Sequence, residues 1–365
     1  MVTNKLGLSA DLLIHPGETI FDILNDRNMN QKELAFRLGV SEPYISDVIH
    51  GKKDISRNLA LGLEYVFGTP ASFWLNLQAN YDAELLHVTE SKTISEEERT
   101  IAEKLNDVIS FLKKNQMITD HNHGDDLILD LRRCFQVNSL LSLGFLVSAG
   151  TFMKSERKDA DVYVTGAWLS MCRARMNNDN EYHFQNKNSD HMIAEIRKTM
   201  FLDEAMIPDS LEGILNPYGI HLHLMPSFSK NAVSGAIMKS NAGTYHIYLP
   251  GESVNAYDFW FALFHELGHI CLNHLARTNI YWESDDTDRK ETAADTFALN
   301  AMMNHDSWIS FVNQKDFAFE NICRFAKAQS VPVFIVTGRL QKEKPINEDD
   351  FTDQSVYHFI ISKVM

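Results

Sequence analysis

The sequence predicts a mainly α-helical protein in which a domain of five short helices precedes an α+β domain with a small antiparallel sheet. Residues 18–84 alternate apolar helical faces with tight turns, as expected of a compact helical bundle. Residues 219–226 and 236–249 alternate in the manner of strands, and the second range contains a turn at Asn241-Ala242-Gly243. An almost wholly apolar run then indicates a buried helix over about residues 255–276.

The composition of the chain excludes several classes of protein. Apolar residues make up 44% and charged residues 23%, which is typical of a folded protein and not of a disordered one. The longest nearly apolar stretch, residues 140–152, is shorter than the roughly 20 residues of a membrane span, and we find no secretory signal. The four cysteines contain no CxxC pair. We therefore expect a cytoplasmic protein with reduced thiols and no membrane contact.

The order of these patterns predicts three parts. Composition becomes polar at residues 88–100, where Ser95 and Glu98 mark the start of a charged helix. The expected parts are a helical domain at 1–88, a helical linker or interaction region at 89–207, and the α+β domain with a helical C-terminal tail at 208–365.

The most informative part of the first domain is NQKELAFRLGVSEPYISDVIHGKK, residues 30–53. Gly39 permits a turn after a first helix, and Ser41 can cap a second helix that has Pro43 in its first turn. The apolar residues of the second helix share one face, which leaves a short polar outer face of the size that enters a DNA major groove. This pattern predicts a helix-turn-helix.

The charge of this domain limits how it can bind DNA. Residues 1–84 hold seven basic and eleven acidic side chains, a net charge of −4, and the whole chain carries −15, so only a local patch can attract phosphates. Lys52, Lys53 and Arg57 form such a patch just after the second helix. The candidate DNA-contact residues are Gln31, Ser41, Glu42, Pro43, Tyr44, Ser46, Asp47, Lys52, Lys53 and Arg57.

With HPGETIFDIL before it and GTPASFWLNLQANYD after it, this segment resembles the lambda-repressor-like (Xre-type) domains of HigA antitoxins. The resemblance implies a homodimer that binds operator DNA, with a toxin or a repressor as a protein partner. The alternative is a helical bundle that has kept the fold and binds protein instead of DNA.

The second informative motif is FWFALFHELGHICLNH. His265 and His269 are four residues apart, so they share one face of a helix and can both offer ring nitrogens to one ion. Glu266 lies beside them and can hold and deprotonate a water molecule bound to the metal. The HExxH spacing therefore predicts a hydrolytic metal site.

A third ligand is expected from the segment ETAADTFALNAMM. Glu291 lies 22 residues after His269, and Asp295 follows one helical turn later. This spacing suits Glu291 as a ligand and Asp295 as the hydrogen-bond partner of a ligand histidine. Two histidines and a glutamate leave a fourth position for water, as in catalytic zinc sites. We expect one zinc ion per chain, with manganese as the alternative ion; without a metal, the motif would be a hydrogen-bonded pair of buried histidines.

The HELGH and ETAADTFA helices and the strands before them resemble the ImmA/IrrE family of gluzincin-like metallopeptidases, which act on helix-turn-helix repressors. The resemblance extends from about residue 131 to 340 and matches a long form fused behind a HigA-type domain. It implies that His265, His269 and Glu291 bind the metal and that Glu266 is the general base.

These motifs lead to three hypotheses about function. In the first, a DNA-binding transcriptional regulator carries a zinc metallopeptidase that cleaves a partner repressor or antitoxin, or its own segment near residues 86–100. In the second, the protein is a HigA-like antitoxin or repressor whose metal domain is non-catalytic and serves dimerisation or sensing. In the third, which ranks last because no fourth protein ligand is evident nearby, zinc only stabilises the fold.

Three further histidines are not expected to be ligands. His221 and His223 share one face of a predicted strand, where they could bind a metal, but a solvent-facing pair is commoner. His274 follows His269 by five residues, which places it about 140° around a helix from that ring.

Overall fold

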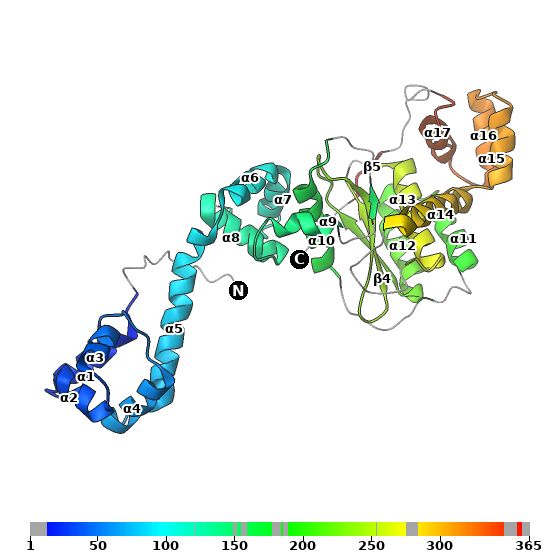
Figure 1. The fold of residues 1–365 in the computed structure, drawn as a ribbon. Helices are drawn as coiled ribbons and strands as arrows, with labels where there is room; N and C mark the ends of the chain where they lie inside the picture. The colour runs from blue at the N-terminus through cyan, green and yellow to red at the C-terminus, as the bar shows by residue number, and fades with distance from the viewer. Residues whose placement is uncertain are drawn as a thin grey trace. The chain divides into compact units, whose positions relative to one another are not determined.

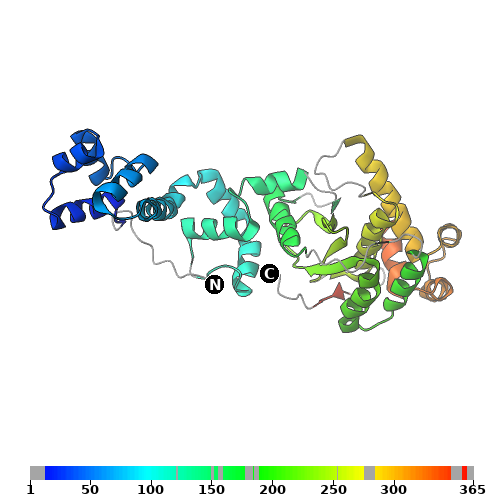
Figure 2. The same cartoon turned by 90° about the horizontal axis from the view of Figure 1, so that it is seen from below.

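The protein forms two compact units, Met1–Ser95 and Glu96–Met365. In this computed structural model the described residues are 13–120, 122–148, 152–154, 159–176, 184, 189–252, 254–274, 284–346 and 356–359. Figures 1 and 2 show the elements of each unit from two directions.

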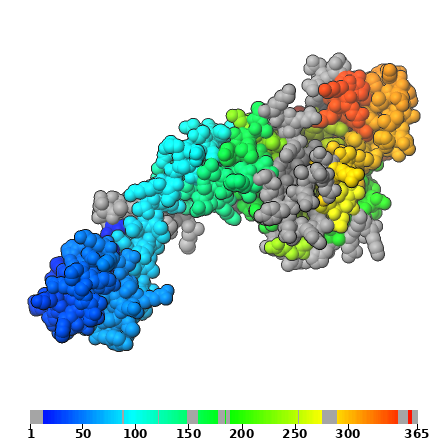
Figure 3. Space-filling model, viewed as in Figure 1, coloured from blue at the N-terminus to red at the C-terminus, as the bar shows by residue number. Residues whose placement is uncertain are grey.

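The first unit confirms the predicted domain of five helices. Its helices are α1 (Pro16–Asp26), α2 (Gln31–Leu38), α3 (Glu42–Ile49), α4 (Arg57–Phe67) and α5 (Ala71–Thr89), followed by a 3₁₀ turn, Glu90–Thr93. Asn30, Ser41 and Ser56 cap three of them, each accepting a backbone N–H in the first turn. Apolar residues from all five helices meet in one core, which includes Ile20 and Trp74. In Figure 3 the described residues of this unit run from dark blue to cyan.

The second unit opens with a helical part that is interrupted by the first strand of the sheet, Phe152–Lys154. Its helices are α6 (Glu96–Lys104), α7 (Asn106–Lys114), α8 (Gly124–Phe135), α9 (Ser142–Ser148) and α10 (Val162–Ala174). Glu98 on α6 and Arg132 on α8 join two of these helices through a buried ion pair, with side-chain exposures of 2% and 10%. The helical part is therefore held by a specific polar contact as well as by apolar packing.

The sheet has four strands in the order β1-β3-β4-β2. The strands are β1 (Phe152–Lys154), β2 (Ile220–Met225), β3 (Val233–Lys239) and β4 (Tyr245–Pro250). The hairpin β3–β4 and the pair β1–β3 are antiparallel, as predicted for the small sheet, whereas β2 and β4 are parallel. The reason is that β4 lies between β2 and β3, and the chain reverses once from β2 to β3 and again from β3 to β4.

The remaining helices share one apolar core with one face of the sheet. They are α11 (Ser189–Thr199), α12 (Ile207–Leu215), α13 (Ala256–Cys271), α14 (Ser284–Met302), α15 (His305–Asn313), α16 (Phe319–Gln329) and α17 (Val333–Lys342). A short pair, β5 (Val254–Asn255) and β6 (Val356–Tyr357), closes one end of this core. Figure 1 shows α10 and α13 on either side of the sheet. The mainly α fold with a small sheet agrees with the predicted class, and none of the helices in the described ranges has the length and hydropathy to cross a membrane.

Candidate metal centre and DNA-contact surface

The central element of the candidate metal centre is α13, whose sequence explains its burial. The side-chain oxygen of Asn255 caps the helix by accepting two backbone N–H groups of the first turn. The run FWFALF supplies apolar side chains on all sides, so α13 packs against β3, β4, α14 and α17 together. His265, Glu266 and His269 are consequently carried into the interior, each at most 1% exposed.

Three donor side chains converge where α13 meets α14. His265 Nε2 lies 3.1 Å from both His269 Nε2 and Glu291 Oε2, and His269 Nε2 lies 3.5 Å from Glu291 Oε1. The α14 backbone approaches α13 at Gly268, where a Cβ atom would lie only 3.2 Å from the Cα of Ala294. Gly268 therefore allows α14 to come close enough for Glu291 to reach the two histidines.

This donor set fits a divalent metal ion. Within the described part of the chain, these three residues form a group whose candidate ligand atoms all lie within 4.8 Å of one another. Burial opposes ionisation of Glu291, but hydrogen bonds from the two histidines lower its pKa to about 2. Burial also opposes the charge on His265, but Asp295 and Glu291 raise its pKa to about 9. An arriving cation must therefore displace a proton from His265.

The second ring nitrogen of each histidine also has a partner. Asp295 Oδ1 lies 2.8 Å from His265 Nδ1, and His274 Nδ1 lies 3.0 Å from His269 Nδ1. The helical projection used for His274 does not apply, because α13 ends at Cys271 and the chain reverses before His274. The sequence carried one signal for this reversal, Asn273, because asparagine readily adopts the left-handed conformation at a helix end, but the helix predicted over about residues 255–276 ran past it.

Glu266 is a fully buried carboxylate, and neither of its oxygens has a hydrogen-bond partner among the described residues. Burial raises the pKa of this carboxyl group to about 8. Strand β3 passes so close that a Cβ atom at Gly235 would lie 2.9 Å from Glu266 Oε1. A buried carboxylate without a partner is costly, so a water or a substrate group beside the three donors would satisfy it.

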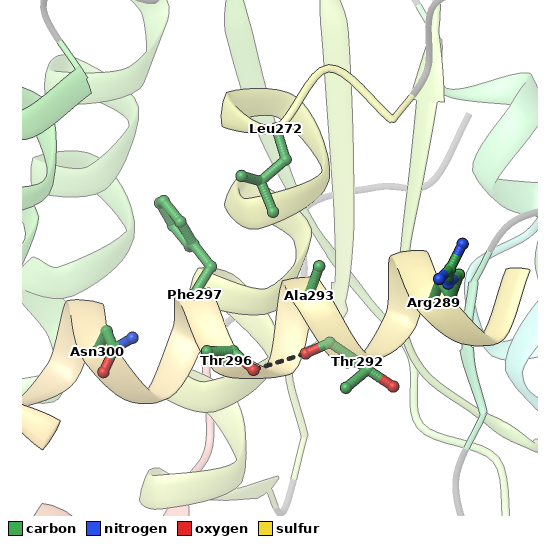
Figure 4. A pocket seen from close by; sticks show the side chains of 7 residues that line it. All are labelled: Leu272, Arg289, Thr292, Ala293, Thr296, Phe297 and Asn300. Carbon is green, nitrogen blue, oxygen red and sulfur yellow. Dashed lines mark hydrogen bonds between the residues drawn. The ribbon is translucent and has the colours of Figure 1, made fainter. Parts of the chain in front are cut away.

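A surface groove of about 720 Å³ runs along the outer side of α14. Its lining residues are Leu272, Arg289, Thr292, Ala293, Thr296, Phe297 and Asn300. Figure 4 shows Leu272 and Phe297 lining its apolar part, with Arg289 and Asn300 towards its two ends. None of the three donor residues is among its lining residues, so the groove is a neighbour of the candidate metal centre and not its opening.

The candidate DNA-contact surface is built by α2, α3 and the start of α4. Ser41 Oγ accepts the backbone N–H of Tyr44 at 3.4 Å, and three apolar residues of α3 are buried. All ten residues predicted to contact DNA lie at the surface, either exposed or half-buried. Lys53 Nζ lies 3.1 Å from Asp47 Oδ2 and 5.2 Å from the centre of the Tyr44 ring. The ion pair with Asp47 offsets part of the charge of Lys53, so Lys52 and Arg57 are the stronger phosphate candidates.

Two family models match separate parts of the chain. Residues 20–74 match the family model Helix-turn-helix, and residues 232–309 match the family model Peptidase U49. The N-terminal domain belongs to the helix-turn-helix family. The second match includes β3, β4, α13 and Glu291, so the chain carries a Peptidase U49 domain around the candidate metal centre.

Relatives of the helix-turn-helix domain occur in Dichelobacter nodosus. Virulence-associated protein A' is 39% identical over 69 residues, which are 19% of this chain and 60% of that protein. Virulence-associated protein I is 34% identical over 73 residues, 20% of this chain and 68% of that protein. The chain therefore spans 60% of the length of the first relative and 68% of the second.

Solved structures similar to the helix-turn-helix domain include two described as antidote or antitoxin proteins. An antidote protein of a plasmid maintenance system from Nostoc punctiforme is 38% identical and covers 22% of this chain and 87% of its own, with a TM-score of 0.21. The Pseudomonas aeruginosa antitoxin HigA, solved with the higBA promoter, is 32% identical and covers 23% of this chain and 97% of its own, with a TM-score of 0.21.

The histidines of β2 lie on the face of the sheet opposite to α13. Leu222 and Leu224 of β2 pack with the α13 core, so the alternate residues His221 and His223 face the other way. The rings of both stack on His246 of β4, and His223 Nε2 lies 3.0 Å from His246 Nδ1. The structure therefore separates this histidine stack from the candidate metal centre of the Peptidase U49 domain.

The stack predicts an acid-sensitive step in stability. Burial lowers the pKa of His223 from 6.5 to about 3, and the neighbouring His246 contributes to this shift. The unfolded chain then binds a proton that the folded chain does not, so stability falls as the pH drops from 6.5 towards 3. Replacing His223 with glutamine should reduce the slope of the unfolding free energy against pH by up to about 1.4 kcal/mol per pH unit, as measured by urea unfolding of the metal-free protein. Parallel declines for His223→Gln and the unmodified protein would contradict this explanation.

Proposed function

We propose that this protein is a DNA-binding transcriptional regulator whose Peptidase U49 domain is a zinc metallopeptidase of the HExxH gluzincin type. The observation that carries the proposal is the convergence of His265, His269 and Glu291 beside the buried, unpartnered carboxylate of Glu266. The family matches in the two units support the pairing of DNA binding with proteolysis. Its substrate in this proposal is a partner repressor or antitoxin.

Each side chain of the centre has a separate task in the proposed reaction. His265, His269 and Glu291 would hold zinc, and Asp295 would fix the ring of His265. A bound zinc ion supplies a Lewis acid that polarises a peptide carbonyl and acidifies water. Glu266 would orient the attacking water, take its proton and pass it to the leaving amine. The raised pKa of Glu266 suits a group that both accepts and returns a proton near neutral pH.

Cleavage of a partner is better supported than cleavage of the chain itself. The segment proposed for self-cleavage, residues 86–100, consists largely of the end of α5, the 3₁₀ turn Glu90–Thr93 and the start of α6. Carbonyl groups within α-helices already accept hydrogen bonds and are surrounded by their own side chains. Self-cleavage there would require local unfolding first, whereas an extended segment of a partner would not.

A second function is favoured by one observation. The ligand histidines are 1% exposed, and the surface groove of α14 does not include them. A centre whose two ligand histidines are this deeply buried suits a HigA-like antitoxin or repressor whose metal domain supports dimerisation or sensing. Both functions require the same three donors, so they differ only in whether peptide bonds are cleaved.

Peptide cleavage is the test that separates the two functions. The zinc-loaded protein is incubated alone and with the product of a neighbouring gene, and new fragments are identified by mass spectrometry. We expect fragments from the unmodified protein and from the control Glu320→Gln, which removes an exposed carboxylate on α16. Glu266→Gln should bind zinc equally and yield none. Equal cleavage by Glu266→Gln would overturn the assigned base, and no cleavage by any zinc-loaded form would support the second function.

DNA binding is expected to depend on the basic residues at the start of α4. Arg57→Gln should weaken binding to the DNA upstream of the gene and reduce the salt dependence, the slope of log K against log [salt], by about 0.9. The matched control is Lys327→Gln, which removes one exposed positive charge from α16 in the other unit. Fluorescence anisotropy at several salt concentrations measures both slopes. Equal slopes for the two variants would favour a helical bundle that binds protein.

A further inference from the structure

The end of α13 folds back onto the candidate ligand His269. The backbone N–H of His274 donates to the carbonyl of His269 at 2.9 Å, and that of Asn273 donates to the carbonyl of Ile270 at 3.0 Å. Asn273 has a φ of 57°, in the left-handed region. These two hydrogen bonds and the left-handed residue define a Schellman motif, which ends a helix by reversing the chain over its last turn.

This reversal brings two imidazole rings together. His269 Nδ1 lies 3.0 Å from His274 Nδ1, and the ring planes meet edge to face at 69° with centroids 5.0 Å apart. The other nitrogen of His269, Nε2, points towards His265 and Glu291. A neutral imidazole that presents Nε2 to a metal carries its proton on Nδ1 and needs an acceptor for it. His274 Nδ1 is in the place of that acceptor.

We propose that His274 is a positioning residue that fixes the tautomer and the ring orientation of His269 for metal binding. This inference rests on the proposed metal centre and adds to it a residue that the HExxH pattern does not contain. The two ligand histidines would then be supported differently, His265 by the carboxylate of Asp295 and His269 by a neutral ring. The turn after α13 becomes part of the metal centre, because the same motif that ends the helix delivers His274.

The test compares two replacements of His274 in the full-length protein. Phenylalanine keeps a ring and removes the acceptor, whereas the Oδ1 atom of asparagine is attached to Cγ in the same way as the histidine Nδ1 atom. Zinc affinity is measured by competition with a chromophoric chelator, and the stability of each metal-free protein by urea unfolding. We expect His274→Phe to weaken zinc binding by about 10- to 100-fold and His274→Asn to stay within about threefold of the unmodified protein. Both metal-free variants should be about equally stable.

A backbone variant tests the same contact independently. Asn273→Val places a β-branched residue at a positive φ, which should disturb the turn and weaken zinc binding, while Asn273→Gly should not. Unchanged zinc affinity in both His274→Phe and Asn273→Val would overturn the role of His274 while leaving the metal centre intact. If the unmodified protein bound no zinc, the proposed centre would fail together with this inference. Because the readout is metal affinity, loss of peptidase activity alone cannot imitate either result.

Discussion

Replacing Glu291 with glutamine is expected to weaken zinc binding by more than about 100-fold, beyond the usual effect of losing a residue that only supports a ligand. The substitution keeps the size of the side chain but removes the negative charge that faces both histidines. The metal-free centre should change as well, because Glu291 helps to raise the pKa of His265 to about 9. Zinc binding by the unmodified protein at pH 7 should therefore release protons, which calorimetry in buffers of different ionisation enthalpy measures.

A graded set of variants makes this prediction specific. Asp295→Asn should weaken zinc binding by about 10- to 100-fold, because it removes the partner of His265 and not a ligand. Glu320→Gln on α16 should have no effect, since its exposed side chain lies outside the three-donor group. We expect zinc affinity to be highest for Glu320→Gln, lower for Asp295→Asn and lowest for Glu291→Gln. Equal affinity of Glu291→Gln and Glu320→Gln would exclude Glu291 as a ligand.

Replacing Arg132 with methionine is expected to destabilise the Glu96–Met365 unit by about 3–5 kcal/mol. Arg132 donates to Glu98 at 3.0 and 2.6 Å, and Glu98 also accepts the backbone N–H of Leu140 at 2.8 Å. The side chain of Glu98 is only 2% exposed, so removing the guanidinium leaves a buried carboxylate without its counter-ion. Urea unfolding followed by circular dichroism measures the loss.

The control for this prediction is the adjacent Arg133. Its side chain is 57% exposed and pairs with Asp130 at the surface, so Arg133→Met should cost about 0–1 kcal/mol. The double variant Glu98→Leu with Arg132→Met should regain much of the lost stability, because it removes both charges. Similar losses for Arg132→Met and Arg133→Met would show that the buried pair contributes no more than a surface pair.

The buried pair also has a defined pH dependence. Burial by itself would raise the pKa of Glu98, but the hydrogen bonds from Arg132 and Leu140 outweigh it and lower the folded-state pKa below 4.5. The folded chain therefore releases this proton more readily than the unfolded chain. The stability that ionised Glu98 contributes is complete above pH 4.5 and is lost as the pH falls through the lower, folded-state pKa.

Short-range patterns in the sequence predicted many of the elements of the fold, but not β1, which lies in the region predicted to be helical. The caps and apolar spacing around Ser41 predicted the second helix of the helix-turn-helix, and the alternation at residues 219–226 and 236–249 predicted β2, β3 and β4. The four-residue spacing of His265 and His269 was enough to place both rings on one side of α13. These features depend on contacts between residues close in sequence, which helical and strand periodicity describe directly.

Contacts between distant residues were decided only by the tertiary structure. Three such contacts join segments that are far apart in the sequence: the approach of α14 at Gly268, the parallel pairing of β2 with β4, and the pair Glu98–Arg132. Helical and strand periodicity describes only residues close in sequence, so it could not predict them. His274 shows the same limit within five residues, because a helical projection holds only while the helix continues, and here a left-handed residue reverses the chain. Periodicity predicts the direction in which a side chain leaves its own element, and packing decides which other side chain it meets.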